Sequence, residues 1–235
     1  VSIYLDTVAP TGKVYADPTL LSSGGKTKAS SLYYSATDTG GLSACYVKGP
    51  GASSYAEYAN GATLTTSGSY SFYCVDLAGN ISSTYSVFMD HDAPTLSCNV
   101  SEFSETVNKA FTVTANDGHS TFTLYYRRPG DSSFTAASGS SITIPVTSAD
   151  GKYYFYAADA MGNTSSTVWI ELNVDVPVAT IVKSSTDNRV YATWDSANIT
   201  ATLNGSSYTK GTWVSQEGDY TLKITDTVTG RTGTY

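Results

Sequence analysis

The sequence predicts an all-β protein built from tandem antiparallel β-sandwich modules. Its composition, a repeated strand pattern and a proline after each repeat all point to this fold class. Of the 235 residues, 19 are tyrosines and only 14% are charged. Tyrosine and threonine favour pleated, half-buried strands. No segment has a sustained apolar period of about 3.6 residues, so helices are not expected. A chain of this length suits two or three domains of ordinary size.

A ten-residue pattern that ends in proline occurs three times. The segment YSVFMDHDAP from Tyr85 aligns without gaps on VSIYLDTVAP from Val1 and on VWIELNVDVP from Val168. The closing prolines are Pro10, Pro94 and Pro177, which lie 84 and 83 residues apart. Self-similarity at a fixed period is typical of modular arrays, and these repeats indicate three modules.

Each module also carries a strand followed by a turn and the start of another strand. GSYSFYCVDLAGNISS from Gly68 matches GKYYFYAADAMGNTSS from Gly151, and EGDYTLKITDTVTGRT from Glu217 repeats the theme with one inserted residue. The Asp, Gly and Asn after the strand suit a turn that needs positive φ and side chains that bond their own backbone. Alternation of apolar and polar residues indicates strands, and in the third copy it turns one set toward a core. That set is Tyr220, Leu222 and Ile224.

The proline of each copy sets the expected domain boundaries, because proline cannot donate to a strand ladder and holds its predecessor extended. We expect residues 1–8 to be the last strand of a preceding module, and complete modules at 9–92 and 93–175. A short third module at 176–235 is expected to end in an incomplete last strand at 231–235. Both ends then look cut from a longer array whose linkers are short and stiff.

The order of strand, D-x-AGN turn, strand and D-x-AP resembles the bacterial immunoglobulin-like (Big-type) tandem repeats of Gram-positive surface proteins, adhesins and large secreted glycosidases. The resemblance covers essentially the whole chain. The third module is similar to a short variant of that family but reads DTVTG from Asp226 in place of D-x-AGN. The resemblance implies tandem immunoglobulin-like antiparallel β-sandwiches in which the tyrosine of each G-x-Y plays a corner role. These tyrosines are Tyr70, Tyr153 and Tyr220.

Composition and motifs argue against several functions. The formal charge of −7 without a Lys or Arg cluster argues against nucleic-acid binding. No apolar stretch approaches the ~20 residues that cross a bilayer, and the first residues do not look like a signal peptide, so we expect an export signal or wall anchor outside this sequence. His91 and His119 are the only candidate neutral-pH bases, and no nucleophile elbow, HExxH or Walker-type loop is present. We therefore expect no enzyme and no catalytic residues.

The acidic residues on loops raise the question of calcium. They comprise Asp90 and Asp92 at a module junction and Asp38, Asp76, Asp117 and Asp159 on loops. Carboxylates are hard oxygen ligands, but no EF-hand or nonapeptide spacing is present. The interpretation we favour is that these residues cap turns and keep sheet edges soluble. We expect no metal site and no cofactor, with weakly bound calcium at loops or module junctions as the alternative, and little effect of chelation on stability.

The three cysteines are Cys45, Cys74 and Cys98, and their odd number leaves at least one thiol unpaired within the chain. Alignment of the first two repeats places Cys45 opposite Leu124 and Cys74 opposite Ala157, on inward positions of strands that should be neighbours. A disulfide between Cys45 and Cys74 would suit an exported protein. Because the second module manages without the pair, two buried thiols acting as small hydrophobes are the alternative.

The second module also predicts an outer aromatic surface. The alternation that buries Tyr153, Phe155, Leu124 and Ile170 turns four other aromatics to the opposite face of the sheet. These four candidate binding residues are Tyr125, Tyr154, Tyr156 and Trp169. Aromatic platforms suit sugar faces and protein partners, but cross-strand aromatic pairs also stabilise sheets without any ligand.

Two function classes follow, and a spacer is the one we favour. Repeated sandwiches with short proline linkers would hold a distal head away from the cell wall of a bacterium, on its extracellular surface. The alternatives are a module that binds a host glycan or host protein, and an accessory region of a large secreted glycosidase. The expected partners are the adjacent modules of the same chain, with no nucleic acid and no direct membrane insertion.

Overall fold

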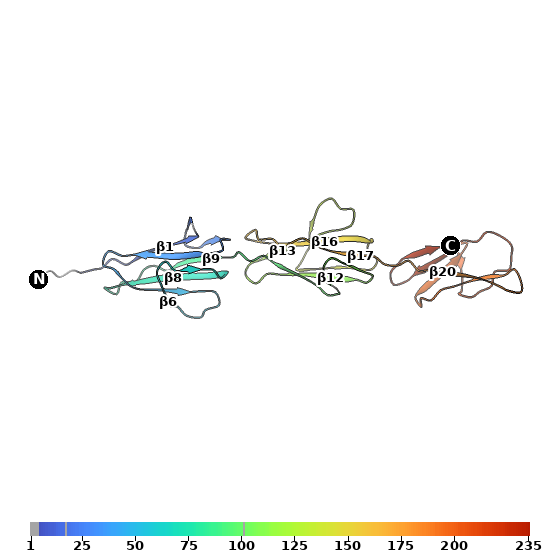
Figure 1. Ribbon diagram of the computed structural model, residues 1–235, viewed down its shortest axis with the longest axis horizontal. Coiled ribbons are helices and arrows are strands. Elements are labelled where there is room, and N and C mark those ends of the chain that lie inside the picture. The colour runs from blue at the N-terminus through green and yellow to red at the C-terminus, as the bar shows by residue number, and fades with distance from the viewer. Residues whose placement is uncertain (1–4, 17, 101) are drawn as a thin grey trace. The chain divides into compact units, whose positions relative to one another are not determined.

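All regular elements of the described chain are strands. The computed structural model describes residues 5–16, 18–100 and 102–235 (Figure 1). None of these residues forms a helix long and apolar enough to cross a membrane. The chain divides into two compact units, which are taken in turn below. They comprise residues 5–96, 115–124 and 157–166 in the first unit, and residues 97–114, 125–156 and 167–235 in the second.

Two sheets enclose one core in the first unit. Their strand orders are β2-β1-β4-β7 and β3-β9-β8-β5-β6, and β3 pairs in parallel with β9 whereas the other strands pair antiparallel. The strands of the first sheet are β1 (Thr11–Ala16), β2 (Thr19–Leu21), β4 (Leu32–Thr37) and β7 (Thr63–Leu64). Those of the second are β3 (Gly25–Thr27), β5 (Leu42–Lys48), β6 (Ala56–Tyr58), β8 (Gly68–Asp76) and β9 (Tyr85–Met89).

Alternation along β8 decides which of its side chains enter this core. Tyr70, Phe72 and Cys74 are buried, whereas the residues between them lie on the outer face. On the opposite sheet, β4 buries Tyr34, whose ring stacks on Phe72 with centroids 4.9 Å apart. The core is therefore filled from both sheets, as in a β-sandwich.

The next two sheets repeat this strand order, except that the smaller one has no counterpart of β2 among the described residues. They are β10-β12-β15 and β11-β17-β16-β13-β14, and β11 again pairs in parallel with β17. The strands of the smaller sheet are β10 (Thr95–Cys98), β12 (Phe111–Asn116) and β15 (Ser141–Ile144). Those of the larger are β11 (Glu105–Val107), β13 (Phe122–Arg127), β14 (Thr135–Ala136), β16 (Gly151–Asp159) and β17 (Val168–Leu172). The predicted inward residues Leu124, Tyr153, Phe155 and Ile170 are all buried.

The last part of the second unit contains two small sheets. A two-stranded sheet pairs β18 with β19, and a four-stranded sheet has the order β21-β20-β22-β23. These strands are β18 (Thr180–Lys183), β19 (Val190–Thr193), β20 (Ile199–Leu203), β21 (Ser206–Ser207), β22 (Leu222–Asp226) and β23 (Thr232–Thr234). Trp194, Tyr208, Leu222 and Ile224 belong to its core.

The predicted tyrosine corner is present in all three repeats. Each hydroxyl donates to the main-chain carbonyl four residues earlier, at 2.7, 2.7 and 3.1 Å. The donor and acceptor pairs are Tyr70 with Thr66, Tyr153 with Ala149, and Tyr220 with Gln216. The expectation that Tyr220 faces the core is wrong, because β22 begins only at Leu222 and the Tyr220 ring is 38% exposed.

The prolines lie where strands begin. Pro10 and Pro94 directly precede β1 and β10, and β18 begins three residues after Pro177. Of the segment expected to be a preceding module's last strand, residues 1–4 lie outside the described residues and residues 5–8 are not strand. Residues 231–235, expected as an incomplete strand, contain β23, which pairs with β22. The module boundaries at 9–92, 93–175 and 176–235 stay predictions.

Candidate functional site

Two inward rows of the first sandwich continue into aspartates. Because the side-chain period of a strand is two residues, Asp38 follows Ala36 on the inward side of β4, and Asp76 follows Cys74 on β8. These strands belong to different sheets. Their carboxylates therefore meet at one end of the core, where Asp76 is only 1% exposed.

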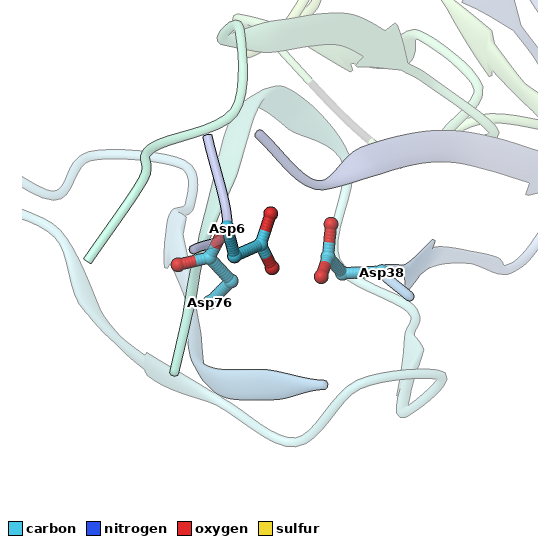
Figure 2. A group of neighbouring side chains, drawn as sticks. All are labelled: Asp6, Asp38 and Asp76. Atoms are coloured by element: carbon cyan, nitrogen blue, oxygen red, sulfur yellow. The ribbon is translucent and has the colours of Figure 1, made fainter. Parts of the chain in front are cut away.

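Asp6, which precedes β1, completes a group of three carboxylates with Asp38 and Asp76. One oxygen of each lies within 4.8 Å of an oxygen of each of the others. Figure 2 shows the three side chains approaching from three separate segments of chain. A Cβ atom at Gly40 would collide with the Asp6 carboxylate, so glycine at that position keeps the approach open.

The same arrangement recurs 79 to 84 residues later, in Asp90, Asp117 and Asp159. Asp117 continues the inward row of β12, and Asp159 ends the inward row of β16. Asp90 directly follows β9, and all three residues belong to the first compact unit. Their carboxylate oxygens also lie within 4.8 Å of one another, and here Asp90 is fully buried.

An asparagine fixes each group. The Asn163 side-chain amide donates to Asp159 Oδ2 at 2.7 Å and to the main-chain carbonyl of Asp90 at 3.0 Å. In the first group, the Asn80 amide donates to Asp76 Oδ2 at 2.8 Å and to the Asp6 carbonyl at 3.2 Å. The asparagine of each D-x-x-G-N turn thus links the turn to the segment that carries the third aspartate.

The turns also lower the pKa of their aspartates. Burial alone would raise the pKa of Asp159, but hydrogen bonds from the Asn163 side chain and from backbone N–H groups outweigh it and hold the pKa below its ordinary value. The same balance, with Asn80 as donor, lowers the pKa of Asp76. The glycines of these turns, Gly79 and Gly162, have φ of +90° and +84°. Both turns therefore have the positive φ and the hydrogen bonds between side chain and backbone that the sequence predicts.

Turn capping occupies both oxygens of Asp76 and Asp159 but only part of the other carboxylates. Asp38 Oδ1 accepts from the Gly40 N–H at 2.7 Å, and Asp117 Oδ1 accepts from His119 and Ser120, both at 2.8 Å. The second oxygens of Asp90 and Asp117 are buried and have no hydrogen-bond partner among the described residues. Capping is thus confirmed as one role of these aspartates, but it leaves two buried oxygens unexplained.

The third repeat lacks this group of acids. Asn173 aligns with Asp6 and Asp90, and Ser196 follows Trp194 on the row where the other repeats carry Asp38 and Asp117. Asp226 is the remaining acid. Hydrogen bonds from the backbone of Thr229 and Val228 lower its pKa, and Ser196 also donates to it. Of the three aspartates found in each of the other repeats, the third repeat therefore keeps only the one that accepts hydrogen bonds from its own turn.

The four predicted aromatic residues lie on the outer face of β13, β16 and β17. Tyr125 and Tyr156 stack with ring centroids 4.8 Å apart and planes 6° from parallel. Tyr154 and Trp169 are direct cross-strand partners. All four side chains are partly buried, so the surface they form is not fully open.

Neighbouring cations and one further aromatic cover this surface. The Arg127 guanidinium lies 4.4 Å from the centre of the Tyr154 ring and 5.4 Å from that of Phe134, and Phe134 packs edge-on against Tyr156 at 4.9 Å. Lys152 Nζ lies 3.9 Å from the centre of the Trp169 ring. Our sequence interpretation missed Phe134, Arg127 and Lys152. The alternation of β16 does place Lys152 on the same face as Tyr154.

The first sandwich carries a smaller version of the same stack. Tyr46 and Tyr73 are cross-strand partners whose rings stack at 4.9 Å, and Tyr55 packs edge-on against Tyr73 at 4.9 Å. Tyr55 and Phe134 both follow a Ser-Ser pair in the loop after the matching strand. The recurrence shows that such stacks are part of how these sheets are built.

The two histidines converge on Asp92. His91 Nδ1 lies 3.6 Å from Asp92 Oδ1, and His119 Nε2 lies 3.4 Å from Asp92 Oδ2. His91 Nε2 also lies 2.9 Å from the carbonyl oxygen of Thr65. Our sequence interpretation did not bring these two histidines together. Both side chains are partly exposed.

The structure joins Cys45 and Cys74 in a disulfide across β5 and β8. The two residues are direct cross-strand partners, and both side chains are buried. Cys98 on β10 is a free, partly exposed thiol. In the second sandwich Leu124 and Ala157 are buried at the matching positions.

Comparison with solved structures finds similar proteins at low identity. The fibronectin(III)-like modules of Clostridium thermocellum CbhA are 16% identical, cover 70% of this chain and 94% of theirs, and have a TM-score of 0.28. The chicken CNTN1 FN1-FN3 domains are 12% identical, cover 97% of this chain and 98% of theirs, and score 0.35. The N-terminal eight Ig domains of Down Syndrome Cell Adhesion Molecule are 11% identical, cover 99% of this chain and 41% of theirs, and score 0.42.

No protein-family model matches the chain, and no curated protein matches it. The fold is therefore argued from its sheets, which repeat one strand order in two successive sandwiches and place a tyrosine corner in each repeat. The chain is a tandem array of immunoglobulin-like β-sandwich modules.

Proposed function

We propose that this chain is a non-enzymatic spacer in an exported bacterial cell-surface protein, where its modules hold an adhesive head away from the cell wall. The observation that carries the proposal is the repetition of one sandwich with short connections. β9 and β10 are separated by residues 90–94, and the Asn163 amide is bonded to the Asp90 carbonyl within that connection. Short, fixed connections suit a role in reach and stiffness.

Two further features support a structural role outside the cell. The Cys45–Cys74 disulfide suits an oxidising compartment. The candidate bases for catalysis, His91 and His119, both lie beside the Asp92 carboxylate at the surface. Neither feature requires a substrate.

Small-angle X-ray scattering on the full chain tests the spacer. A compact protein of this length would have a radius of gyration of about 18 Å. A spacer predicts a radius well above that value and a cross-section as thin as one sandwich. A radius near the compact value would contradict the proposal.

The outer aromatic face supports a second candidate, a module that binds a host glycan or a host protein. Tyr154 and Trp169 pair on the same face as the Tyr125–Tyr156 stack, and aromatic faces suit both ligand classes. Glycan arrays that include mucin glycans, together with a pull-down of host immunoglobulins, test it. Binding that is lost in a Tyr154→Ser, Trp169→Ser double variant would favour this role over the spacer. An accessory region of a secreted glycosidase remains a third candidate, which no contact described above favours.

A further inference from the structure

The Asp90 carboxylate is buried with only one of its oxygens bonded. Its Oδ1 accepts from the Asp92 N–H at 3.2 Å, whereas Oδ2 has no hydrogen-bond partner among the described residues. The side chain is 0% exposed, so water does not reach it from the surface. Asp117 Oδ2 is buried and unpartnered in the same way. A buried carboxylate that lacks a partner is costly, so these oxygens point to a missing cation.

The positive charge does not come from the described part of the chain. Its salt bridges involve Asp92, Asp150 and Asp187, and none includes Asp90, Asp117 or Asp159. The hydrogen bonds from Asn163 and from backbone N–H groups reduce the negative potential of the group but do not neutralise it. Three carboxylates within 4.8 Å of one another therefore remain to be balanced.

We propose that Asp90, Asp117 and Asp159 bind a divalent cation, and that the cation is calcium. Calcium lies about 2.3–2.6 Å from its oxygen ligands, so two ligands of one ion are at most about 5.2 Å apart. The spacing of the three carboxylates falls within this limit without any movement. Magnesium demands near-ideal octahedral geometry and gives up its water molecules reluctantly, so it is rarely held by protein ligands alone. Zinc prefers nitrogen and sulfur ligands, which this group does not offer.

The first repeat carries a matching group of aspartates. Asp6, Asp38 and Asp76 occupy the matching positions and show the same spacing and the same asparagine link (Figure 2). Asp6 and Asp38 are more exposed than Asp90, and neither has an unpartnered buried oxygen. The proposal therefore concerns the Asp90 group, where the buried oxygens require a counter-charge.

A cation at this site would link three separate segments of the chain. Asp90 lies on the segment that follows β9, whereas Asp117 and Asp159 follow or end β12 and β16. One ion would hold this segment to both turns, in addition to the hydrogen bond from Asn163. The proposal replaces the expectation that chelation leaves the stability unchanged. It does not depend on the spacer role.

Calorimetric titration of the full, chelator-stripped chain with calcium chloride tests the site. The titration is made on the Asp38→Asn variant, so that the first group does not contribute heat. We expect one ion per chain and a melting temperature that rises with calcium concentration. Adding Asp90→Asn or Asp117→Asn should weaken binding at least about tenfold, because each removes a charged ligand. Adding Asp175→Asn, the same charge change in the next linker, should leave binding unchanged.

Two outcomes would contradict a calcium site at Asp90. If the folded Asp38→Asn chain gives no heat and no rise in melting temperature up to about 10 mM calcium, beyond the range of weak extracellular sites, the site does not exist. Unchanged affinity after Asp90→Asn would place the ion elsewhere. Circular dichroism establishes folding of each variant, and if Asp90→Asn does not fold, Asp117→Asn decides the question by the same criterion.

Discussion

The side-chain amide of Asn163 donates a hydrogen bond to the main-chain carbonyl of Asp90, with a nitrogen to oxygen distance of 3.0 Å. The same nitrogen also holds the Asp159 carboxylate. One residue of the D-x-x-G-N turn thus connects the turn to a residue 73 positions earlier in the sequence. The Asn163 side chain therefore stabilises its own turn and also positions the segment that contains Asp90.

This contact predicts a cost for removing the amide. We expect Asn163→Ala to lower the free energy of unfolding by about 1–3 kcal/mol, because it leaves the buried Asp90 carbonyl and one oxygen of the Asp159 carboxylate without a donor. Asn108→Ala, at an exposed position, should change stability by less than about 0.5 kcal/mol. Urea denaturation of both variants measures the difference. Equal stabilities would show that the Asn163 contact contributes nothing.

How much of this arrangement the sequence predicts depends on the element. The strand pattern and the inward residues follow from period-two alternation, which is a local property of the sequence, whereas the tyrosine corners were expected from the resemblance that the G-x-Y motif carries. Tyr220 departs from its expected place because alternation cannot tell where a strand begins, and β22 starts only at Leu222.

The grouping of the aspartates could not be predicted from alternation along single strands. Each aspartate is visible in the sequence, but their grouping depends on which sheets carry β4, β8, β12 and β16. A signal was present: Asp38 and Asp117 continue inward rows past the last buried residue, where a polar side chain needs a partner. Contacts such as Arg127 on Tyr154 depend on side-chain packing across strands, which periodicity does not encode.

The disulfide predicts a difference between the first two sandwiches. Replacing Cys45 and Cys74 by Leu and Ala, the residues found in the second repeat, should lower the free energy of unfolding by about 2–4 kcal/mol in the loop-entropy model. A reducing agent should destabilise the parent chain similarly and leave the variant unaffected. Unfolding curves with and without reductant measure both effects. A parent chain that is insensitive to reductant would contradict the prediction.

The outer aromatic face predicts a stability effect that needs no ligand. We expect the Tyr154→Ser, Trp169→Ser double variant to unfold about 1–3 kcal/mol more easily, because it removes a cross-strand pair and the contacts with Arg127 and Lys152. Thermal and urea unfolding measure this change. Unchanged stability, with loss of binding to a captured glycan or protein, would instead assign the face to recognition.

Asp226 predicts an acid-sensitive turn in the third repeat. Backbone hydrogen bonds lower its folded-state pKa below the unfolded value of about 3.9. Its contribution to stability is therefore fully present above that unfolded value and is lost as the pH falls through the lower, folded value. Asp226→Asn should remove this part of the pH dependence. Unfolding free energies measured between about pH 2 and 6 check it, and parallel curves for parent and variant would contradict it.

The central claim is that the chain is a run of separate sandwiches that hold distance between its two ends. Stretching the full chain from both ends in a single-molecule force experiment tests it most directly. The account predicts three separate unfolding events. In reductant one of them should lengthen by about 100 Å, because the bridge between Cys45 and Cys74 withholds 29 residues of ~3.6 Å each. A single unfolding event for the whole chain, or extension without any resisted step, would contradict it.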